Sequence, residues 1–508
     1  MAWSFLNAFY GLVGLALLWL AVQLLQVLWL RPRRLERVLR AQGLRGTSYC
    51  FLTGDLNESH RLNKEARSRP FPLGCHDIGQ HIFPLIYNTA REHGKTCFFW
   101  SGPVPNVAMC DAGHVKEMLS DKLGKRIFPA VAKLLTNGLD QQEGHKWVHQ
   151  RKTVNPAFSI EAINHATPAF SACCQEMVMR WTERLGRNGA GEMDVWAELS
   201  QLSGEVISRT AFGSSYLEAT GVFQLQTEQI ERLVSTFWNF LLPGYVYLPT
   251  PNNRRMHQIN REIESTLRRL IGKRVHQMEQ GISTKHDMLG LLLESNAASE
   301  DTMTIQEIVE NSKLFYFAGS ETTAILLTWT MVVLSMHTEW QARAREEVLG
   351  LFGKSKPKYQ DLDRLKTVTM ILHEVLRLYP PAAMIKRKIY KEAQIGGVTY
   401  PAGIFVDVPV LLIHHDSDIW GSDVHEFRPE RFAQGIAKAS KVQGAYIPFG
   451  LGPRNCIGQN YAMVEGKIAL CMILQHFEFE LAPAYTHAPH YLVTLQPMHG
   501  AQIKLTTI

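Results

Sequence analysis

Residues 1–30 of this chain are unsuited to a water-soluble fold, because they contain no Asp, Glu, Lys or Arg. The stretch from Phe9 to Leu30 is apolar except for Gln23 and Gln26, and a helix needs about 20 such residues to cross a bilayer. Arginines follow immediately, at positions 31, 33, 34, 37 and 40. Basic residues that flank a membrane span stay in the cytosol. The pattern therefore predicts a membrane anchor with a lumenal N-terminus and a cytosolic body.

A cleaved signal peptide is the alternative for this segment. Signal peptides begin with basic residues, have a shorter apolar run and end at a small-residue cleavage site. None of these features is present, so we expect an uncleaved anchor. The sequon Asn57-Glu58-Ser59 would then face the cytosol and remain unmodified.

The rest of the chain has globular composition, with 46% hydrophobic and 20% charged residues. Residues 31–74 are basic and contain the stiff segment Pro70-Phe71-Pro72, which indicates a linker. Residues 75–508 show no internal linker or repeat, so we expect one large domain there. Helical periodicity dominates this domain, for example at 254–281 and 305–337, whereas strand patterns are short, at 96–109, 386–408 and 491–505. The predicted fold is mainly α with a minor β-sheet region.

The net charge of +6 is modest for 508 residues. Basic residues are not interleaved with aromatic ones, as they would be on a nucleic-acid-binding surface. A mildly basic protein suits an anionic membrane surface or an acidic protein partner.

Eight cysteines are spaced irregularly, which argues against a disulfide framework and fits a reducing compartment. Cys456 differs from the others because it follows the Gly- and Pro-rich run Pro448–Asn455 and precedes a helical pattern. A helix N-terminus favours a thiolate, and Gly458 lets the backbone approach a large flat ligand. In this loop Arg454 can reach a carboxylate and Phe449 can shield the sulfur. A glycine-rich turn with an incidental buried cysteine is the alternative.

Two nucleotide-binding motifs are excluded by inspection. Gly450-Leu451-Gly452 does not complete a dinucleotide fingerprint, because Asn455 replaces the third glycine. Gly353-Lys354-Ser355 is not a phosphate-binding loop, because Val348 occupies the position of the upstream glycine. The chain thus shows no nicotinamide or flavin motif, so electrons for any redox reaction would have to come from elsewhere.

The cysteine loop resembles that of the cytochromes P-450, and other motifs of that family follow in the same order. The helix Glu374-Val375-Leu376-Arg377 and the run Phe427–Phe432 are similar to two of these motifs. The resemblance implies that Cys456 is the axial ligand of a haem b (iron protoporphyrin IX) iron. It also implies that Glu374, Arg377 and Arg431 form a buried ion network that supports the cysteine loop.

The run Ala318-Gly319-Ser320-Glu321-Thr322-Thr323 lies in a long apolar pattern. Small residues such as Ala318 let a helix approach a flat cofactor. The resemblance implies that Thr322 hydrogen-bonds dioxygen at the haem and that Glu321 helps to deliver protons, since O–O cleavage consumes protons in a site closed to water. The alternative is a kink caused by back-bonding of Ser or Thr to the preceding turn.

Three further residues are implied to bind the haem propionates, namely Trp147, Arg151 and Arg387. Arg pairs well with carboxylates because its geometry is bidentate. His145 and His149 are four residues apart and could clip a metal, but no third ligand is near in the sequence, so a solvated helix face is the simpler interpretation.

The implied reaction inserts one oxygen atom from dioxygen into a C–H bond, with electrons from NADPH through a membrane-bound NADPH-cytochrome P-450 reductase. A basic face near the cysteine loop would dock that partner, with Lys146, Lys152 and Lys467 as candidates. The implied location is the endoplasmic reticulum membrane, with a single span and a cytosolic catalytic domain.

Predicted substrate-pocket walls are mostly apolar, which favours a lipophilic substrate. They comprise 127–139, Leu314, Phe315, Ala318, 382–385 and 497–499. The apolar segment 237–247 is either core or a membrane-contacting patch. Within the family the chain looks most similar to plant family seventy-two, subfamily A, whose members oxidise terpenoids.

Two other functions remain open at this point. A haem-thiolate isomerase or dehydratase uses no dioxygen and tends to lose the acid–threonine pair, which is intact here as Glu321-Thr322. A non-catalytic haem protein would sense gas or carry electrons. Consumption of NADPH with a lipophilic compound separates these alternatives.

Overall fold

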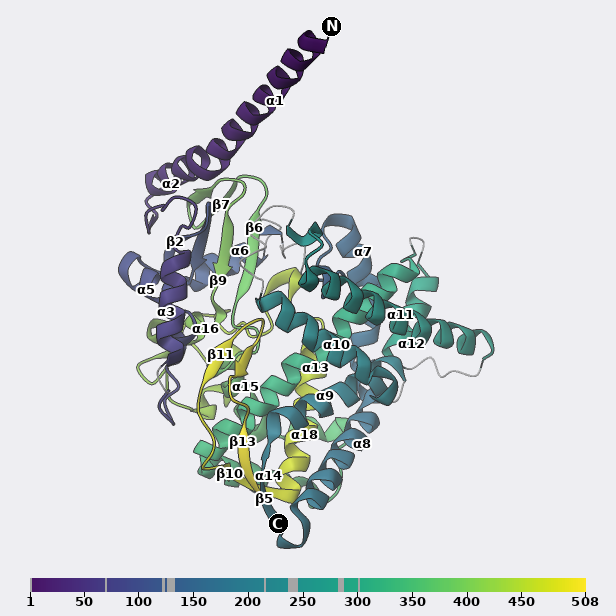
Figure 1. Ribbon diagram of the computed structural model, residues 1–508. Coiled ribbons are helices and arrows are strands. Elements are labelled where there is room, and N and C mark those ends of the chain that lie inside the picture. Colours follow the sequence, from purple (N-terminus) through teal and green to yellow (C-terminus); the bar gives the residue numbers. More distant parts are fainter. Residues whose placement is uncertain are drawn as a thin grey trace. The chain divides into compact units, whose positions relative to one another are not determined.

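The computed structural model describes residues 2–68, 71–120, 124–125, 133–213, 216–235, 245–281, 287–299 and 302–508. It is mainly helical with small β-sheets, which confirms the predicted fold class (Figure 1). Residues 127–132 of the predicted pocket wall 127–139 and residues 237–244 of the apolar segment 237–247 lie outside the described residues. The chain divides into two compact units. The first comprises residues 1–69, 79–125 and 384–413, and the second comprises residues 70–78, 126–383 and 414–508.

The first unit contains the N-terminal helices and most of the strands. Its helices are α1 (Ala2–Leu25), α2 (Arg31–Ala41), α3 (Leu56–Ser68), α4 (Gly79–Ile82), α5 (Pro84–His93), α6 (Ala112–Ser120) and most of α16 (Val410–His414), with the π-helical segment Gln26–Leu30 between α1 and α2. Its strands are β1 (Arg45–Gly46), β2 (Thr96–Ser101), β3 (Val104–Met109), β4 (Gly124–Lys125), β6 (Ile385–Ile389), β7 (Ala393–Ile395), β8 (Val398–Tyr400) and β9 (Phe405–Val408).

Six of these strands form one sheet in the order β1-β2-β3-β9-β6-β4. Strands β2 and β3 are antiparallel, with Phe98 opposite Val107, whereas β3 and β9 are parallel, with Val107 opposite Val406. These positions are buried, because β-branched and aromatic side chains pack well on a pleated surface. Residues 31–68, expected to be a linker, are instead folded: they form α2, α3 and strand β1, which pairs with β2.

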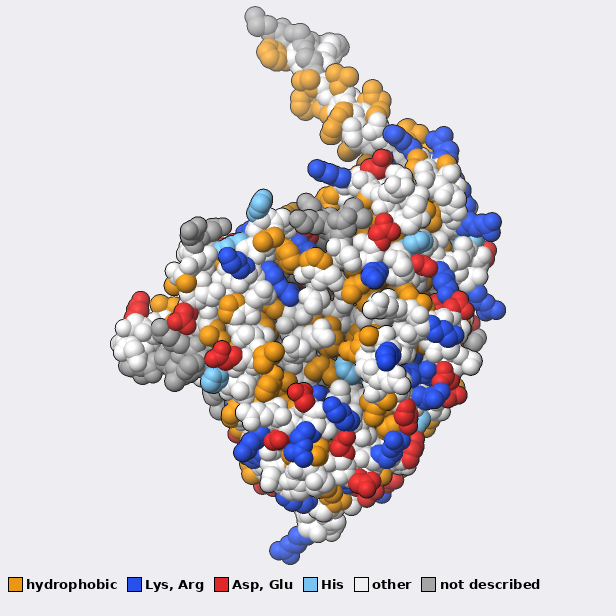
Figure 2. All heavy atoms as spheres, turned by 180° about the vertical axis from the view of Figure 1, so that it is seen from behind, with side chains coloured by type: hydrophobic (Ala, Val, Ile, Leu, Met, Phe, Trp, Pro, Cys, Tyr) orange, Lys and Arg blue, Asp and Glu red, His pale blue; other side chains and the backbone are white. Residues whose placement is uncertain are grey.

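The N-terminal helix exposes its large apolar side chains. Phe9, Leu12, Leu15 and Trp19 are each more than 60% exposed, and Figure 2 shows hydrophobic side chains along this helix. The run Phe9–Ala41 is long and apolar enough to cross a membrane. Helix α13 is the second described helix that meets these criteria, but it is mostly buried, as the core helix of a globular body would be.

The second unit is mainly helical, and most of its helices are longer than ten residues. They are α7 (Gly144–Val154), α8 (Ile160–Leu185), α9 (Val195–Phe212), α10 (Tyr216–Ser235), α11 (Pro251–Glu279), α12 (Met288–Ala297), α13 (Ile305–Met336), α14 (Thr338–Phe352), α15 (Lys366–Leu378), α17 (Ser417–Trp420) and α18 (Gln459–His476). The sheet β10-β13-β5 joins Phe477–Leu481, Gln502–Thr507 and Ala190–Asp194, and β11 (Pro489–Tyr491) pairs with β12 (Leu495–Pro497).

Helix α13 is the centre of this unit and packs against α9, α15 and α18. It begins at a capping box, in which Thr304 and Glu307 satisfy each other's backbone N–H groups. A Cβ added at Gly319 would lie 2.8 Å from Cδ1 of Ile207. Gly319 therefore allows α9 to approach α13.

Candidate active site

The loop before α18 turns back on itself to present Cys456. Gly450 and Gly452 have φ values of 76° and 74°, which side chains with a Cβ rarely adopt. The Cys456 N–H donates to the carbonyl of Phe449 at 2.8 Å, and the Asn455 N–H donates to that of Gly452 at 3.1 Å. These bonds place Cys456 three residues before the first residue of α18, with its side chain exposed.

Cys456 differs from most other cysteines in accessibility. Cys97, Cys110, Cys173, Cys174 and Cys471 are buried. Burial raises the pKa of Cys97 and of Cys173 to about 12 and raises that of Cys174 and of Cys471 as well. Such thiols are poor metal ligands, because the thiolate is the ligand form. Cys456 is the exposed cysteine of the second unit, which disfavours the alternative of an incidental buried cysteine.

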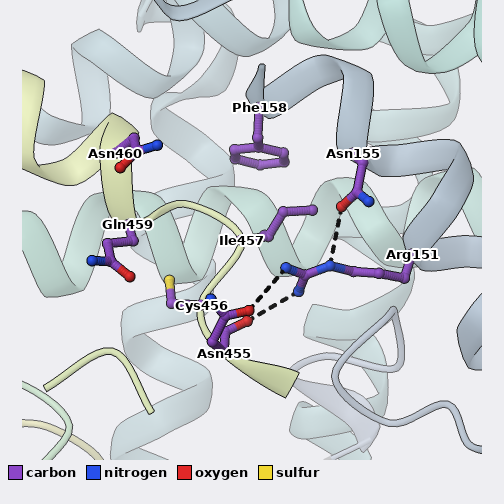
Figure 3. Close-up of a pocket in the computed structure, with 8 residues that line it drawn as sticks. All are labelled: Arg151, Asn155, Phe158, Asn455, Cys456, Ile457, Gln459 and Asn460. Atoms are coloured by element: carbon purple, nitrogen blue, oxygen red, sulfur yellow. Dashed lines mark hydrogen bonds between the residues drawn. The ribbon is translucent and has the colours of Figure 1, made fainter. Parts of the chain in front are cut away.

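A cavity of about 280 Å³ lies beside the sulfur (Figure 3). It is lined by the cysteine loop, the start of α18, the end of α7 and the 3-10 turn that follows α7, through Arg151, Asn155, Phe158, Asn455, Cys456, Ile457, Gln459 and Asn460. A Cβ added at Gly458 would lie 3.7 Å from Cε1 of Phe158 and 4.0 Å from the sulfur. Glycine at 458 therefore keeps the space next to Cys456 clear.

Two arginines brace this loop with different partners. Arg151 donates from Nη1 to the carbonyl of Asn455 at 3.0 Å and from Nη2 to its Oδ1 at 3.3 Å (Figure 3). Arg454 pairs with the Glu143 carboxylate at 2.6 Å, and its guanidinium lies 4.5 Å from the ring centroid of Trp147. Trp147 thus contacts Arg454, and the role at a haem propionate that the resemblance implies for Trp147 and Arg151 stays a prediction. Glu143 was not anticipated, because nothing in the sequence distinguishes it from other acidic residues.

Arg387 belongs to the first unit. It lies in β6, is 6% exposed and donates from Nη1 to the carbonyl of Lys386 at 3.0 Å. Its predicted role at a haem propionate stays a prediction.

One stretch of α13 is accessible although most of the helix is buried. Ala318 is exposed and Thr322 is partly exposed, whereas every residue from Thr323 to Ser335 is buried. The Thr322 hydroxyl donates to the carbonyl of Ala318 at 2.7 Å, and the Ser320 hydroxyl donates to that of Tyr316 at 2.7 Å. The back-bonding proposed as the alternative role of this motif is therefore present.

The Glu321 carboxylate is held by the C-terminal hairpin. It accepts hydrogen bonds from the Gln496 amide at 2.6 Å and the Thr494 hydroxyl at 3.1 Å. Burial raises the pKa of Glu321, and these two donors partly offset the rise. The hairpin is fixed to α13 because the Trp329 indole donates to the carbonyl of Leu495 at 2.7 Å. Thr494 and Gln496 could not be anticipated as partners, since they lie more than 170 positions from Glu321.

Glu374, Arg377 and Arg431 lie in one buried ion network. Glu374 and Arg377 are both 0% exposed and are joined by two bonds of 2.8 Å. Arg431 approaches Glu374 at 3.3 Å and also pairs with Asp423 at 2.9 Å. Arg377 donates further to the carbonyls of His414 and Val424, at 3.0 and 2.7 Å. The network thus holds the segment between α17 and the cysteine loop.

Residues 71–504 match the family model described as cytochrome P450. The chain belongs to the cytochrome P450 family. This cytochrome P450 is 49% identical over 510 residues to cytochrome P450 CYP72A616 of Paris polyphylla, with 98% of each chain covered. It is 46% identical over 494 residues to cytochrome P450 72A397 of Kalopanax septemlobus, covering 96% of this chain and 95% of that one. It is 47% identical over 494 residues to 11-oxo-beta-amyrin 30-oxidase of Glycyrrhiza uralensis, covering 95% of this chain and 94% of that one.

These relatives confirm the predicted resemblance to family seventy-two, subfamily A, and the protein is a cytochrome P450 monooxygenase, an enzyme that uses a haem iron. The cysteine loop fits such a group. Cys456 offers an exposed thiol, Gly458 leaves the adjoining space clear, and Arg151 borders the same cavity with a guanidinium suited to a carboxylate.

Proposed function

We propose that this protein is a membrane-anchored monooxygenase in which Cys456 is the axial ligand of haem b. The observation that carries the proposal is the exposed sulfur on a glycine-dependent loop that borders a cavity. Haem b, when bound, supplies the iron that activates dioxygen, and a thiolate ligand favours O–O cleavage. The backbone bond from Cys456 to Phe449 holds the sulfur in place.

The propionates would be held by the basic side chains that surround the loop. Arg151 and Arg454 both lie beside the cysteine and can each give a carboxylate two parallel hydrogen bonds. Trp147 supports Arg454 by packing under its guanidinium. Arg387 is included because of the family resemblance. On the substrate side, Ala318 presents only a methyl group from an accessible stretch of α13.

Protons would be handled by Thr322 and Glu321. The Thr322 hydroxyl keeps its proton directed at the carbonyl of Ala318, and its oxygen remains able to accept or relay a proton. The raised pKa of Glu321 increases its protonated fraction near neutral pH, which a proton donor requires. Both donors bind Oε1 of Glu321, so Oε2 is the oxygen that would carry the proton.

The substrate class proposed is a lipophilic plant terpenoid. One relative, at 47% identity, is named for the oxidation of 11-oxo-beta-amyrin at position 30. In the second unit Phe315, expected to line the pocket, is buried and packs edge-on against Phe158, with ring centroids 5.4 Å apart. This aromatic pair connects α13 with the cavity next to Cys456.

We propose residues 1–30 as a single-pass anchor in the endoplasmic reticulum membrane and residues 75–508 as the cytosolic catalytic domain. Electrons would come from NADPH through a membrane-bound reductase. Of the three lysines considered for its docking, Lys152 is exposed, Lys146 pairs with Glu307 at 2.7 Å, and burial lowers the pKa of Lys467. Lys152 is therefore the strongest of the three candidates.

The proposal is tested with membranes that contain the full chain and a NADPH-cytochrome P-450 reductase. A panel of terpenoids is supplied with NADPH, and products are read by mass spectrometry. We expect a product that gains one atom from ¹⁸O₂, and no such product when the reductase is omitted. Conversion without oxygen incorporation would favour an isomerase or dehydratase, and a haem protein that converts nothing in a broad panel would favour a sensor or electron carrier.

A further inference from the structure

A cluster of two histidines and one aspartate lies apart from the cysteine loop. One ligand atom of each of Asp77, His415 and His425 lies within 4.8 Å of the other two. The Nδ1 atom of His425 is 3.7 Å from Oδ1 of Asp77, and the rings of His415 and His425 have centroids 5.4 Å apart at an angle of 70°. All three residues belong to the second unit, although Asp77 is more than 330 positions from the histidines.

One ring nitrogen of His415 makes no hydrogen bond. The residue is 8% exposed, and its Nε2 lies 3.0 Å from the carbonyl of Leu378. A carbonyl can only accept, so Nε2 carries the proton and Nδ1 carries a lone pair. Among the described residues, this buried Nδ1 has no hydrogen-bond partner, and the same holds for Nδ1 of His425. Two buried nitrogens without partners are costly unless a ligand satisfies them.

The hydrogen bond from His415 to the carbonyl of Leu378 is also typical of a metal-binding histidine. Histidines that bind a metal usually donate their other ring N–H to a carbonyl or carboxylate, which fixes the tautomer and the orientation of the ring. The residue thus has the tautomer and the support of a metal ligand.

Arg377 holds the backbone on both sides of the cluster. It donates to the carbonyl of His414, next to His415, and to the carbonyls of Val424 and Glu426, which flank His425, at 3.0, 2.7 and 3.3 Å. The two histidines are therefore positioned before any ion arrives. The charge of Arg377 opposes a nearby cation, but its paired partner Glu374 compensates for it.

Two other histidines, His76 and His337, are engaged with each other. Nε2 of His76 lies 3.1 Å from Nε2 of His337, and Nδ1 of His76 lies 2.8 Å from the Tyr379 hydroxyl. Asp77 supplies the negative charge of the cluster, and its side chain is 46% exposed. An ion can thus reach the cluster from solvent.

We propose that Asp77, His415 and His425 bind a divalent transition-metal cation of the zinc type. Two imidazoles and one carboxylate, with solvent as the fourth ligand, suit zinc, whereas calcium and magnesium prefer oxygen ligands alone. Bonds of about 2.1 Å in a tetrahedral site place ligand atoms roughly 3.4 Å apart, so the Asp77–His425 pair at 3.7 Å needs to close by a few tenths of an ångström, and the pairs with His415, which lie within 4.8 Å, by about 1.4 Å at most. The ion would connect the segment before α4, which carries Asp77, to the segment that carries His415 and His425.

The test uses the purified full-length haem protein in detergent, stripped with a chelator and titrated with zinc chloride alone. Calorimetry and elemental analysis after dialysis measure affinity and stoichiometry. We expect one equivalent of zinc, and an affinity about 10- to 100-fold weaker or worse in Asp77→Asn and His425→Ala. Zinc X-ray absorption should show imidazole ligands in the unaltered protein.

His276→Ala is the matched control, because His276 lies 3.8 Å from Glu279 on the surface, and among the described residues no third His, Cys, Asp or Glu joins this pair to form a metal site. It should leave zinc affinity unchanged. Asp77 is exposed, so Asp77→Asn should keep the haem content and circular dichroism of the parent protein. The proposal is overturned if stoichiometric zinc is not bound, or if Asp77→Asn and His425→Ala bind it as tightly as the control. Neither outcome depends on monooxygenase activity.

Discussion

Arg377 donates two hydrogen bonds of 2.8 Å to the two oxygens of Glu374, and neither side chain is exposed. Removing one partner leaves the other as an unpaired buried charge, which costs about 3–5 kcal/mol. We therefore expect Glu374→Ala to lower the free energy of unfolding by about that amount in denaturant titrations. Arg343→Ala breaks the exposed pair with Glu430 and should cost less than about 1 kcal/mol. Equal losses would contradict a special role for the buried network.

Cys456→Ser should abolish the carbon monoxide difference band that reports thiolate ligation, because a hydroxyl is a much weaker electron donor to iron than a thiolate. The band is recorded on reduced membranes that contain the full chain. Cys50→Ser is the control, since Cys50 is also exposed but belongs to the other unit. A band that survives in the Cys456 variant would overturn the assignment.

Thr322→Ala should uncouple turnover, so that NADPH is still consumed while peroxide replaces the oxygenated product. The expected loss of coupling is about 10²-fold or more, in the range of a lost proton-transfer group. Ser320→Ala removes a hydroxyl with the same 2.7 Å back-bond on the same helix and should leave coupling unchanged. If both variants behave alike, the Thr322 hydroxyl serves helix geometry and not proton transfer.

Gln496→Leu removes the donor closest to Glu321. That bond lowers the pKa of Glu321 against the effect of burial, so its loss should raise the pKa further. The carboxyl then stays protonated to higher pH, and the basic limb of the pH profile for coupled turnover should move upward. Gln502→Leu alters an exposed amide that donates to the carbonyl of His499 and should leave the profile in place. An unshifted profile in Gln496→Leu would exclude this control of Glu321.

Glu465 is buried in α18, and burial raises its pKa to about 8. The folded protein therefore holds a proton that the unfolded chain releases above its ordinary pKa of 4.5. The contribution of Glu465 to the free energy of unfolding is greatest below pH 4.5. It declines as the pH rises towards 8, by at most about 1.4 kcal/mol per pH unit. Glu465→Gln should flatten that decline in thermal melts recorded from pH 6 to 9. A slope equal to that of the parent protein would contradict this account.

The parts of the site that could be predicted are those whose signal lies within a few residues. The cysteine loop needs glycine at positions of positive φ, and Glu374 and Arg377 are one helical turn apart, so each leaves a local pattern. The partners Glu143 and Gln496 could not be found, because each meets its arginine or acid only through tertiary packing.

Helix packing also gives two residues of α7 partners that their spacing does not reveal. Trp147 and Arg151 share one face of α7, yet Trp147 packs on Arg454 and Arg151 reaches Asn455. Gly319 makes room for Ile207 of α9. Periodicity gives the side of a helix on which a residue lies, but the neighbour on that side depends on which element packs there.

The strand Gln502–Thr507 pairs with both Phe477–Leu481 and Ala190–Asp194, and the hairpin just before it holds Glu321. Almost the whole chain must therefore be translated before Glu321 of α13 can contact the C-terminal hairpin. Until then, the helices of the second unit leave the ribosome without β13, the central strand of the sheet β10-β13-β5. Nascent chains stalled near the C-terminus should therefore be cleaved by proteases and bound by chaperones more readily than the released protein.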